Sequence, residues 1–248
     1  MPCLPALNNI GYAWVVIGHI VIATENLIEL KNLTKSYRDG GGEILALNDV
    51  STSIHTGSKV AIMGPSGSGK STLLQLIGGL DKPTKGEILV DGQAVQKLGD
   101  AALSEYRNHY IGFIFQSFNL QTFYSALENV ALPLILGGMN PKAAKIQAAA
   151  ALEQVGMGDK LSRMPSQLSG GEMQRIAIAR ALVHKPKVIL ADEPTANLDQ
   201  DNTELVLKLM VDLELAGQAL VVVTHDDRVS SRFERTITLD HGVIKEDK

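Results

Sequence analysis

The chain has 248 residues, 45% of them hydrophobic, which is enough for one large α/β domain or two small ones with a substantial core. A net charge of −4 and a pI of about 5.9 argue against a nucleic-acid-binding protein that relies on a basic surface, and we expect no nucleic-acid partner. The single cysteine, Cys3, excludes an intramolecular disulfide and a cysteine-rich metal site, and it suits the reducing cytosol.

Residues 1–26 do not share the pattern of the rest of the chain. Their apolar run, residues 10–23, is too short for a comfortable membrane span. A signal peptide begins with a basic region, whereas the first basic residue here is Lys31. The segment is either an extra strand or translated sequence upstream of the true start, and we favour the second. We therefore expect an N-terminal extension at 1–26 and one domain at 27–248.

Alternating and apolar runs predict the elements of the first half of this domain. The polar stretch 34–43 contains three consecutive glycines and is typical of a loop, with Tyr37 near its start. Around this loop we expect strands at 27–33, 49–54, 60–63 and 86–90, a first helix at 71–77 and a second helix at 100–107.

The second half adds a helical insert, at about 120–165, to further strands and helices. A buried strand at 111–115 ends at Gln116, and 125–161 is mostly helical, with Pro133 and Pro141 as interruptions. Beyond the insert we expect helices at 173–183 and 203–215, strands at 188–191 and 219–224, and a final hairpin at 236–245.

The stretch GPSGSGKS at 64–71 matches the phosphate-binding pattern G-x-x-x-x-G-K-[ST], and it lies between a predicted strand and a predicted helix as that pattern requires. Its glycines let backbone N–H groups close around a polyphosphate, and the helix N-terminus adds a partial positive charge. Lys70 can reach the β- and γ-phosphates, and Ser71 can hold Mg²⁺. A glycine-rich turn with a surface lysine is the alternative, which the flanking elements disfavour.

Polar residues also follow three other apolar strands. Asp192 is placed to hold Mg²⁺, and Glu193 to polarise an attacking water, although a solvated acidic pair is the alternative. His225 and Gln116 each end a strand, and ligands bind at the carboxyl ends of parallel strands. We therefore predict contact of His225 with a γ-phosphate and of Gln116 with Mg²⁺ or water because their strands share that edge. As isolated residues, neither would be a convincing candidate.

A second glycine-bearing loop, LSGGE at 168–172, opens the predicted helix at 173–183. The dipole of that helix makes its start another anion site. A simple N-cap by Ser169 would explain the loop without any ligand. The alternative is that the loop covers the nucleotide of a second subunit.

Together these stretches resemble the ATP-binding subunits of ABC transporters. The resemblance is carried by GPSGSGKS at 64–71, FQ at 115–116, LSGGEMQR at 168–175, VILADEPTANLD at 188–199 and VTH at 223–225, and it covers roughly residues 27–245. It implies an α/β fold of the P-loop NTPase type, with a parallel-sheet core, an antiparallel β part near the N-terminus and a helical subdomain. It also implies a head-to-tail homodimer that encloses two ATP molecules.

The resemblance implies a role for each matching position. Tyr37 would stack on adenine, and the phosphates would be held by Gly64, Pro65, Ser66, Gly67, Ser68, Gly69, Lys70, Ser71 and Thr72. Mg²⁺ would be bound by Ser71, Gln116 and Asp192, and catalysis would involve Glu193 as the base with His225, Gln116 and Lys70. The partner's ATP would be contacted by Leu168, Ser169, Gly170, Gly171 and Glu172, with Asp199 at the dimer seam.

Two further stretches, IGFIFQSFNL at 111–120 and LENVALPLIL at 127–136, resemble the lipoprotein-releasing, macrolide-exporting and antimicrobial-peptide-resistance group. These ATPases work with separate FtsX-like membrane subunits, which implies a permease partner and a place at the cytoplasmic face of the inner membrane. QTFY at 121–124 replaces the leucine-proline common in that group, and Glu172 replaces the commoner glutamine. The sequence does not identify the cargo.

Two other outputs are compatible with the same motifs. A division-type ABC subunit would regulate cell-wall enzymes through its membrane partner with identical site chemistry. A soluble ABC ATPase acting on ribosomes or DNA is the other reading. It is disfavoured because the chain carries one cassette, and because the segment between Gln116 and Leu168 is too short for a coiled-coil insert.

Deleting residues 2–20 is expected to leave ATPase activity intact, because the family-like pattern begins only near Leu27. The measurement is steady-state phosphate release by the truncated and full-length chains. A truncated chain that is folded and inactive would contradict this expectation.

Overall fold

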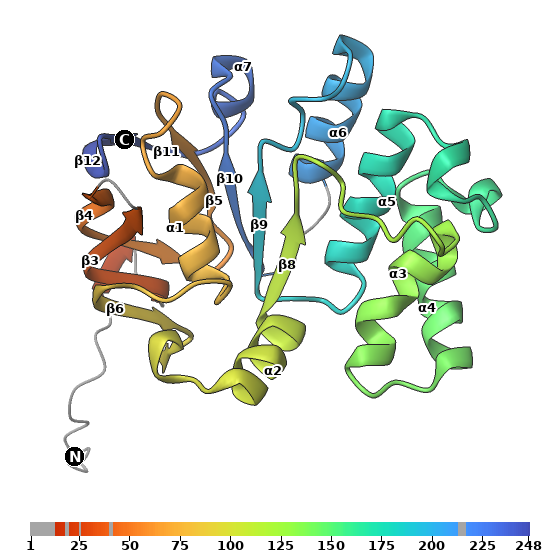
Figure 1. The fold of residues 1–248 in the computed structure, drawn as a ribbon, viewed down its shortest axis with the longest axis horizontal. Helices are drawn as coiled ribbons and strands as arrows, with labels where there is room; N and C mark the ends of the chain where they lie inside the picture. Colours follow the sequence, from red (N-terminus) through yellow and green to blue (C-terminus); the bar gives the residue numbers. More distant parts are fainter. Residues whose placement is uncertain (1–12, 18–19, 25, 40–41, 213–216) are drawn as a thin grey trace.

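The computed structural model describes residues 13–17, 20–24, 26–39, 42–212 and 217–248, and it is built around one central sheet (Figure 1). The sheet has six strands in the order β12-β11-β5-β10-β9-β8. Neighbouring strands from β11 to β8 are parallel, and only β12 runs antiparallel to its neighbour. The strands are β5 (Lys59–Met63), β8 (Ile111–Ile114), β9 (Val188–Asp192), β10 (Ala219–Val223), β11 (Arg235–Asp240) and β12 (Val243–Asp247).

The inner strands are apolar almost throughout because both faces of the sheet are covered. Alternate side chains of β9, such as Val188 and Leu190, pack into a core with helix α1 and the antiparallel sheet. Their neighbours Ile189 and Ala191 pack into a second core with the helices of the other face. The helices outside the insert are α1 (Lys70–Ile77), α2 (Asp100–Tyr110), α5 (Gly170–Leu182), α6 (Gln200–Asp212) and α7 (Asp227–Ser230).

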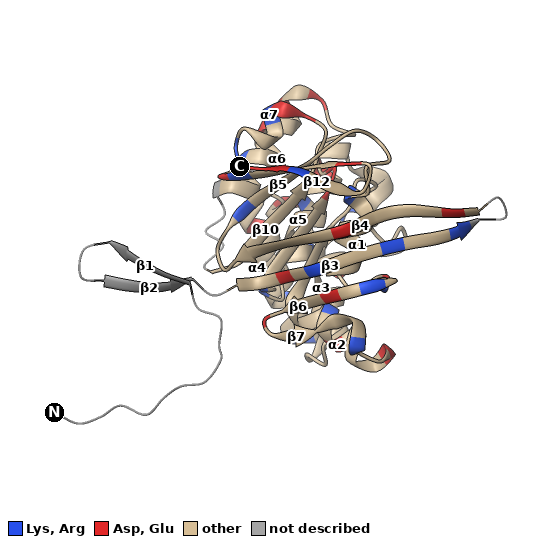
Figure 2. Ribbon diagram, turned by 90° about the vertical axis from the view of Figure 1, so that its left-hand side faces the viewer, with Lys and Arg blue, Asp and Glu red and all other residues tan. Residues whose placement is uncertain are grey.

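A second sheet, antiparallel and four-stranded, lies beside α1 in the order β4-β3-β6-β7. The prediction of a loop at 34–43 is wrong for Thr34–Asp39, which continue strand β3, and for Gly42 and Glu43, which begin β4. The polar residues misled the sequence reading, since one face of this hairpin is solvated and tolerates them. Acidic and basic residues are interspersed along these strands (Figure 2). The strands are β3 (Asn26–Asp39), β4 (Gly42–His55), β6 (Lys85–Val90) and β7 (Gln93–Ala94).

The helical subdomain lies at the opposite end of the molecule from this second sheet (Figure 1). Helix α3 (Ala126–Leu136) begins with a capping box in which the Ser125 hydroxyl accepts from the Glu128 amide at 3.3 Å. Pro133 does not interrupt the helix as predicted but lies inside α3, one turn before its end. The other elements are α4 (Pro141–Gln154) and the 3₁₀ turns η1 (Val95–Lys97), η2 (Gly158–Lys160) and η3 (Pro165–Gln167), of which η1 lies outside the subdomain.

The N-terminal segment contains two short strands, β1 (Ala13–Ile17) and β2 (Ile20–Thr24), which pair antiparallel. The backbone of this segment matches the extra-strand alternative, and a true start downstream of it stays a prediction. Within the described ranges, no helix has both the length and the apolar character needed to cross a bilayer.

Candidate nucleotide site

The predicted site residues meet because four parallel strands end at one edge of the central sheet. Val223 of β10 is in register with Ile62 of β5 and with Asp192 of β9, and Ile114 of β8 is in register with Ala191. The segments that follow these strands therefore emerge side by side. They are the phosphate-binding loop, residues 115–116, residues 192–193 and residues 224–225.

The phosphate-binding loop opens helix α1 without any side-chain cap on the first-turn N–H groups. Gly69 provides this start with a φ of 99°, and a Cβ there would come within 2.4 Å of the Ala46 carbonyl oxygen. Lys70 is 8% exposed, and its ammonium donates to the carbonyls of Gly64 at 2.8 Å and Pro65 at 2.9 Å. Free N–H groups and a buried cation make this an anion-binding site.

A cavity of about 550 Å³ opens over this loop. Glu193 and His225 reach it from β9 and β10, so the structure does bring the loop and both strand-end residues together. Ser68 lies beneath it with a buried hydroxyl that has no hydrogen-bond partner among the described residues. The cavity is lined by 44–46, 66–72, Glu193 and His225.

Two oxygen ligands for a divalent cation converge beside the loop. The Ser71 hydroxyl donates to Asp192 Oδ1 at 3.1 Å. Burial and the nearby Glu193 carboxylate raise the pKa of Asp192, while the Ser71 hydrogen bond and the Lys70 charge oppose that rise. A bound cation would offset the burial and the repulsion from Glu193 that disfavour the ionised Asp192 carboxylate. A hydroxyl and a carboxylate are hard oxygen donors, so the pair fits Mg²⁺.

Glu193 and His225 form a second pair, and both residues line the cavity. His225 Nδ1 lies 2.8 Å from Glu193 Oε1, and the Glu193 side chain is 16% exposed. Glu193 has a φ of 46°, and its amide donates to the Val223 carbonyl at 2.9 Å. This conformation directs Asp192 and Glu193 to different partners. The Asp192 carboxylate is bonded to the loop through Ser71, and the Glu193 side chain lines the cavity.

Other predicted residues lie outside the cavity lining. Gln116 is exposed, and its backbone carbonyl accepts a hydrogen bond from Asn197 Nδ2 at 2.9 Å. Tyr37 is 38% exposed, and its hydroxyl donates to Asp81 at 2.9 Å. Gly64 is packed under β11, since a Cβ there would come within 2.0 Å of the Leu239 carbonyl oxygen.

The second glycine loop is a capped helix start. The Glu172 amide donates to Ser169 Oγ at 3.3 Å, and the Ser169 amide donates to the Glu172 carboxylate at 2.8 Å. The backbone hydrogen bond from Ser169 is the main cause that lowers the pKa of Glu172, and Lys160, at 3.3 Å, acts in the same direction. The simple N-cap considered for Ser169 is therefore present, while contact with a partner's nucleotide stays a prediction.

Asp199 is connected to this loop through Asn202. The Asn202 backbone and side-chain amides both donate to the Asp199 carboxylate, at 2.9 Å and 2.8 Å. The backbone hydrogen bond from Asn202 is the main cause that lowers the pKa of Asp199. A Cβ on Gly171 would come within 2.0 Å of Asn202 Oδ1, so only glycine allows this approach. The predicted signature loop and the predicted seam residue thus form one packed unit.

The sequence reasoning missed the part of the cavity wall that comes from β4. Ile44, Leu45 and Ala46 line the cavity, and Ile44 is 57% exposed. The available signal was the apolar run at 44–47, directly before the strand expected at 49–54, which the three glycines at 40–42 obscured.

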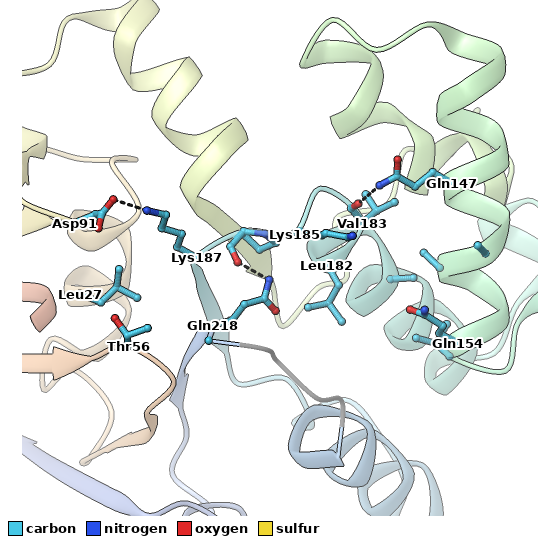
Figure 3. A pocket seen from close by; sticks show the side chains of 16 residues that line it. Leu27, Thr56, Asp91, Gln147, Gln154, Leu182, Val183, Lys185, Lys187 and Gln218 are labelled. Atoms are coloured by element: carbon cyan, nitrogen blue, oxygen red, sulfur yellow. Dashed lines mark hydrogen bonds and ion pairs between the residues drawn. The ribbon is translucent and has the colours of Figure 1, made fainter. Parts of the chain in front are cut away.

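A larger cavity of about 840 Å³ lies elsewhere, near the N-terminal ends of β9 and β10 (Figure 3). Several of its polar side chains are already bonded within the fold. Gln147 donates to the Val183 carbonyl, Gln218 to the Pro186 carbonyl, and Lys187 pairs with Asp91. The candidate nucleotide site is therefore identified by the polar pairs around the phosphate-binding loop and not by cavity volume.

Comparison with known proteins agrees with this geometry. Residues 47–196 match the family model described as "ABC transporter". The lipoprotein-releasing system ATP-binding protein LolD of Idiomarina loihiensis is 45% identical over 91% of this chain and 99% of that protein. LolD of Legionella pneumophila (strain Paris) is 48% identical over 88% of this chain and 96% of that protein.

Solved structures show the same fold. The dimeric ATP-binding cassette MJ0796 in a post-hydrolysis state, bound to ADP and Pi, has a TM-score of 0.83 and 45% identity over 89% of this chain and 97% of that one. The fold and family predictions are thereby confirmed, including the ATPase class and the likeness to the lipoprotein-releasing group. The chain belongs to the ABC transporter family, as an ATP-binding cassette of the ATPase class.

Proposed function

We propose that this chain binds ATP with Mg²⁺ in the 550 Å³ cavity and hydrolyses it to drive a separate membrane subunit. The observation that supports this most strongly is the pairing of Ser71 with Asp192 and of Glu193 with His225 beside an uncapped helix start. The test is phosphate release by the purified chain with ATP and Mg²⁺. No release with ATP and Mg²⁺, or equal release after chelation of the metal, would contradict the proposal.

The reaction is ATP and water to ADP and phosphate. The N–H groups at the start of α1 and the Lys70 ammonium hold the β- and γ-phosphates, and Ser71, Asp192 and Gln116 would hold Mg²⁺. When bound, Mg²⁺ offsets the negative charge on the phosphate oxygens. Water forms the new bond to the γ-phosphorus as the bond to the bridging oxygen of ADP breaks. Glu193 takes the proton from that water, and His225 keeps the carboxylate in place.

The proposed assembly is a head-to-tail homodimer in which Leu168–Glu172 of one copy covers the ATP of the other. Two solved structures of one relative, the cassette MJ0796, are described as dimeric, and one of them holds ADP and Pi. In this chain the loop and Asp199 form a single packed unit at a helix start, which suits a contact surface. Tyr37 would stack on the adenine, next to Ile44 in the cavity wall.

The proposed permease contact is the segment from Phe113 to Tyr124 and the groove beside it. A cavity of about 700 Å³ opens between α2, β8 and α3, and its lining includes Phe113, Phe115 and Leu136. Phe123 is 88% exposed and Tyr124 is 42% exposed, so these aromatic rings do not pack into the helical subdomain. Exposed aromatic surface of this kind marks a contact site for another protein. This contact would keep the cassette at the cytoplasmic face of the inner membrane.

The backbone of this segment is held in place by side chains from two helices. Arg180 of α5 donates to the carbonyls of Phe118 and Asn119. Asn129 of α3 is 1% exposed and donates to the carbonyls of Gln121 and Tyr124. The exposed rings are therefore presented on a fixed loop, so a partner meets a preformed surface.

Replacing Phe123 and Tyr124 together by glutamate is expected to abolish stimulation by the membrane partner while leaving basal ATP hydrolysis within about twofold, since neither ring lines the nucleotide cavity. The partner is first identified by its co-purification with the tagged chain from membranes, and hydrolysis is then measured with and without it. The control is Ile146→Glu on α4, which is 74% exposed. Unchanged stimulation in the double variant would place the interface elsewhere.

A further inference from the structure

Tyr37, the proposed adenine-stacking residue, belongs to a cluster with two side chains that have no role in the proposal above. Lys35 and Tyr37 come from β3, and Asp81 comes from the loop after α1. Lys35 Nζ donates to Asp81 Oδ1 at 2.7 Å, and the Tyr37 hydroxyl donates to Asp81 Oδ2 at 2.9 Å. The carboxylate thus binds both side chains at once, one on each oxygen.

The cluster is fixed by the backbone around it. Lys35 is 9% exposed and also donates to the Lys82 carbonyl at 2.8 Å, while the Lys82 amide donates to Asp81 at 2.7 Å. Burial acts to raise the pKa of Asp81, but hydrogen bonds from Lys35, from the Lys82 amide and from Tyr37 outweigh it and hold that pKa below its usual value. Asp81 therefore stays ionised and keeps accepting both hydrogen bonds at neutral pH.

One face of the Tyr37 ring is closed within this cluster. The Lys35 ammonium lies over the ring, 4.7 Å from its centroid. Tyr37 is paired with Ile44 across the β3–β4 ladder, which places both side chains on the same face of the sheet, and Ile44 lines the nucleotide cavity. Lys35 therefore covers one face of a ring that stands next to a residue of the cavity wall.

We propose that Lys35 and Asp81 are positioning residues for the nucleobase: they orient the Tyr37 ring and close one of its faces, so that the base stacks on the other. This rests on the proposed nucleotide site and deepens it. A ring that is already oriented loses little conformational freedom when the base binds, which strengthens binding. The Tyr37 hydroxyl donates to Asp81, so the ring offers the base a flat surface.

The test compares binding of ADP and of pyrophosphate, each with Mg²⁺, to the full chain by isothermal titration calorimetry. Neither probe is consumed by the hydrolysis reaction, and only ADP carries a base. Tyr37→Ala is expected to weaken ADP binding by about 5- to 100-fold, the range for loss of one base–aromatic stack. Asp81→Asn and Lys35→Met are expected to weaken it by about 3- to 10-fold, with pyrophosphate binding unchanged within about twofold.

A double variant separates positioning from a merely structural role. Because Asp81 acts through Tyr37, adding Asp81→Asn to Tyr37→Ala is expected to cause no further loss of ADP affinity. The matched control is Glu87→Gln. Glu87 lies on β6 of the same sheet and forms an exposed ion pair with Lys97, so its replacement should change neither the ADP nor the pyrophosphate affinity. Melting curves of every variant check that the fold is retained.

Several outcomes would overturn the proposal, and they differ from failure of the nucleotide site itself. Equal losses for ADP and pyrophosphate would show that the cluster supports the phosphate loop instead of the base. Unchanged ADP binding in Asp81→Asn and Lys35→Met would show that the cluster positions nothing. If Tyr37→Ala binds ADP normally, the adenine assignment and the cluster proposal both fail while the phosphate site stands. If the unmodified chain binds neither probe, the proposed function fails with them.

Discussion

Replacing Glu193 by glutamine is expected to slow ATP turnover by roughly 100-fold or more while sparing ATP binding. Glutamine has nearly the same shape and can still accept the hydrogen bond from His225 Nδ1, which now lies 2.8 Å from the carboxylate. It cannot accept a proton from water. The charge of Glu193 also repels Asp192, so its removal favours a site crowded with phosphate oxygens. The ATP-bound state should therefore accumulate, as a dimer that forms only with ATP.

Size-exclusion chromatography of Glu193→Gln with ATP and Mg²⁺, beside a phosphate-release assay, checks both parts of this expectation. The matched control is Glu204→Gln, because Glu204 pairs with Arg232 on the exposed surface of α6 and does not line the cavity. Turnover close to that of the unmodified chain would remove Glu193 as the base. Lost turnover without an ATP-dependent dimer would keep the base and show that closure needs the membrane subunit.

Lys70→Ala is expected to weaken ATP binding itself, by about 10- to 100-fold, which is the loss of one or two charge-assisted hydrogen bonds to phosphate. The ammonium is 8% exposed and is already directed at the loop, where it donates to the carbonyls of Gly64 and Pro65. Alanine removes the only side-chain cation within the lining of the cavity described here. Turnover at low ATP should fall at least as far as affinity does.

Fluorescence titration with a labelled ATP analogue and Mg²⁺ measures this loss. Ser169→Arg provides the contrast, because a bulky cation at the signature loop should block closure of the dimer and leave ATP binding to the loop at 64–71 unchanged. Since the Ser169 hydroxyl also caps α5, Ser169→Ala is needed to account for the lost cap. Normal affinity in Lys70→Ala would exclude the ammonium as a phosphate ligand.

The chemistry of the proposed site can be predicted from local patterns in the chain. A glycine loop between a strand and a helix, and carboxylates at the ends of apolar strands, depend on short-range rules of backbone geometry and hydrophobic alternation. Lys70, Ser71, Asp192 and Glu193 could therefore be predicted one by one from their neighbours in the chain. Their meeting at one edge could be predicted too, because parallel strands bring their carboxyl ends together.

Long-range pairing in the fold adds the remaining residues of the cavity and holds the predicted ones in place. Ile44 lines the cavity because β4 pairs with β3, whereas the glycines at 40–42 had predicted a longer loop there. The Ser169 hydroxyl proved to be committed to its own helix, and Tyr37 proved to be held by Asp81 and Lys35, which are far apart in the chain. Contacts of this kind depend on register, on packing and on which partner a polar group finds when it leaves water. Local patterns carry the periodicity of each strand, but they do not carry the long-range pairings that bring distant side chains together.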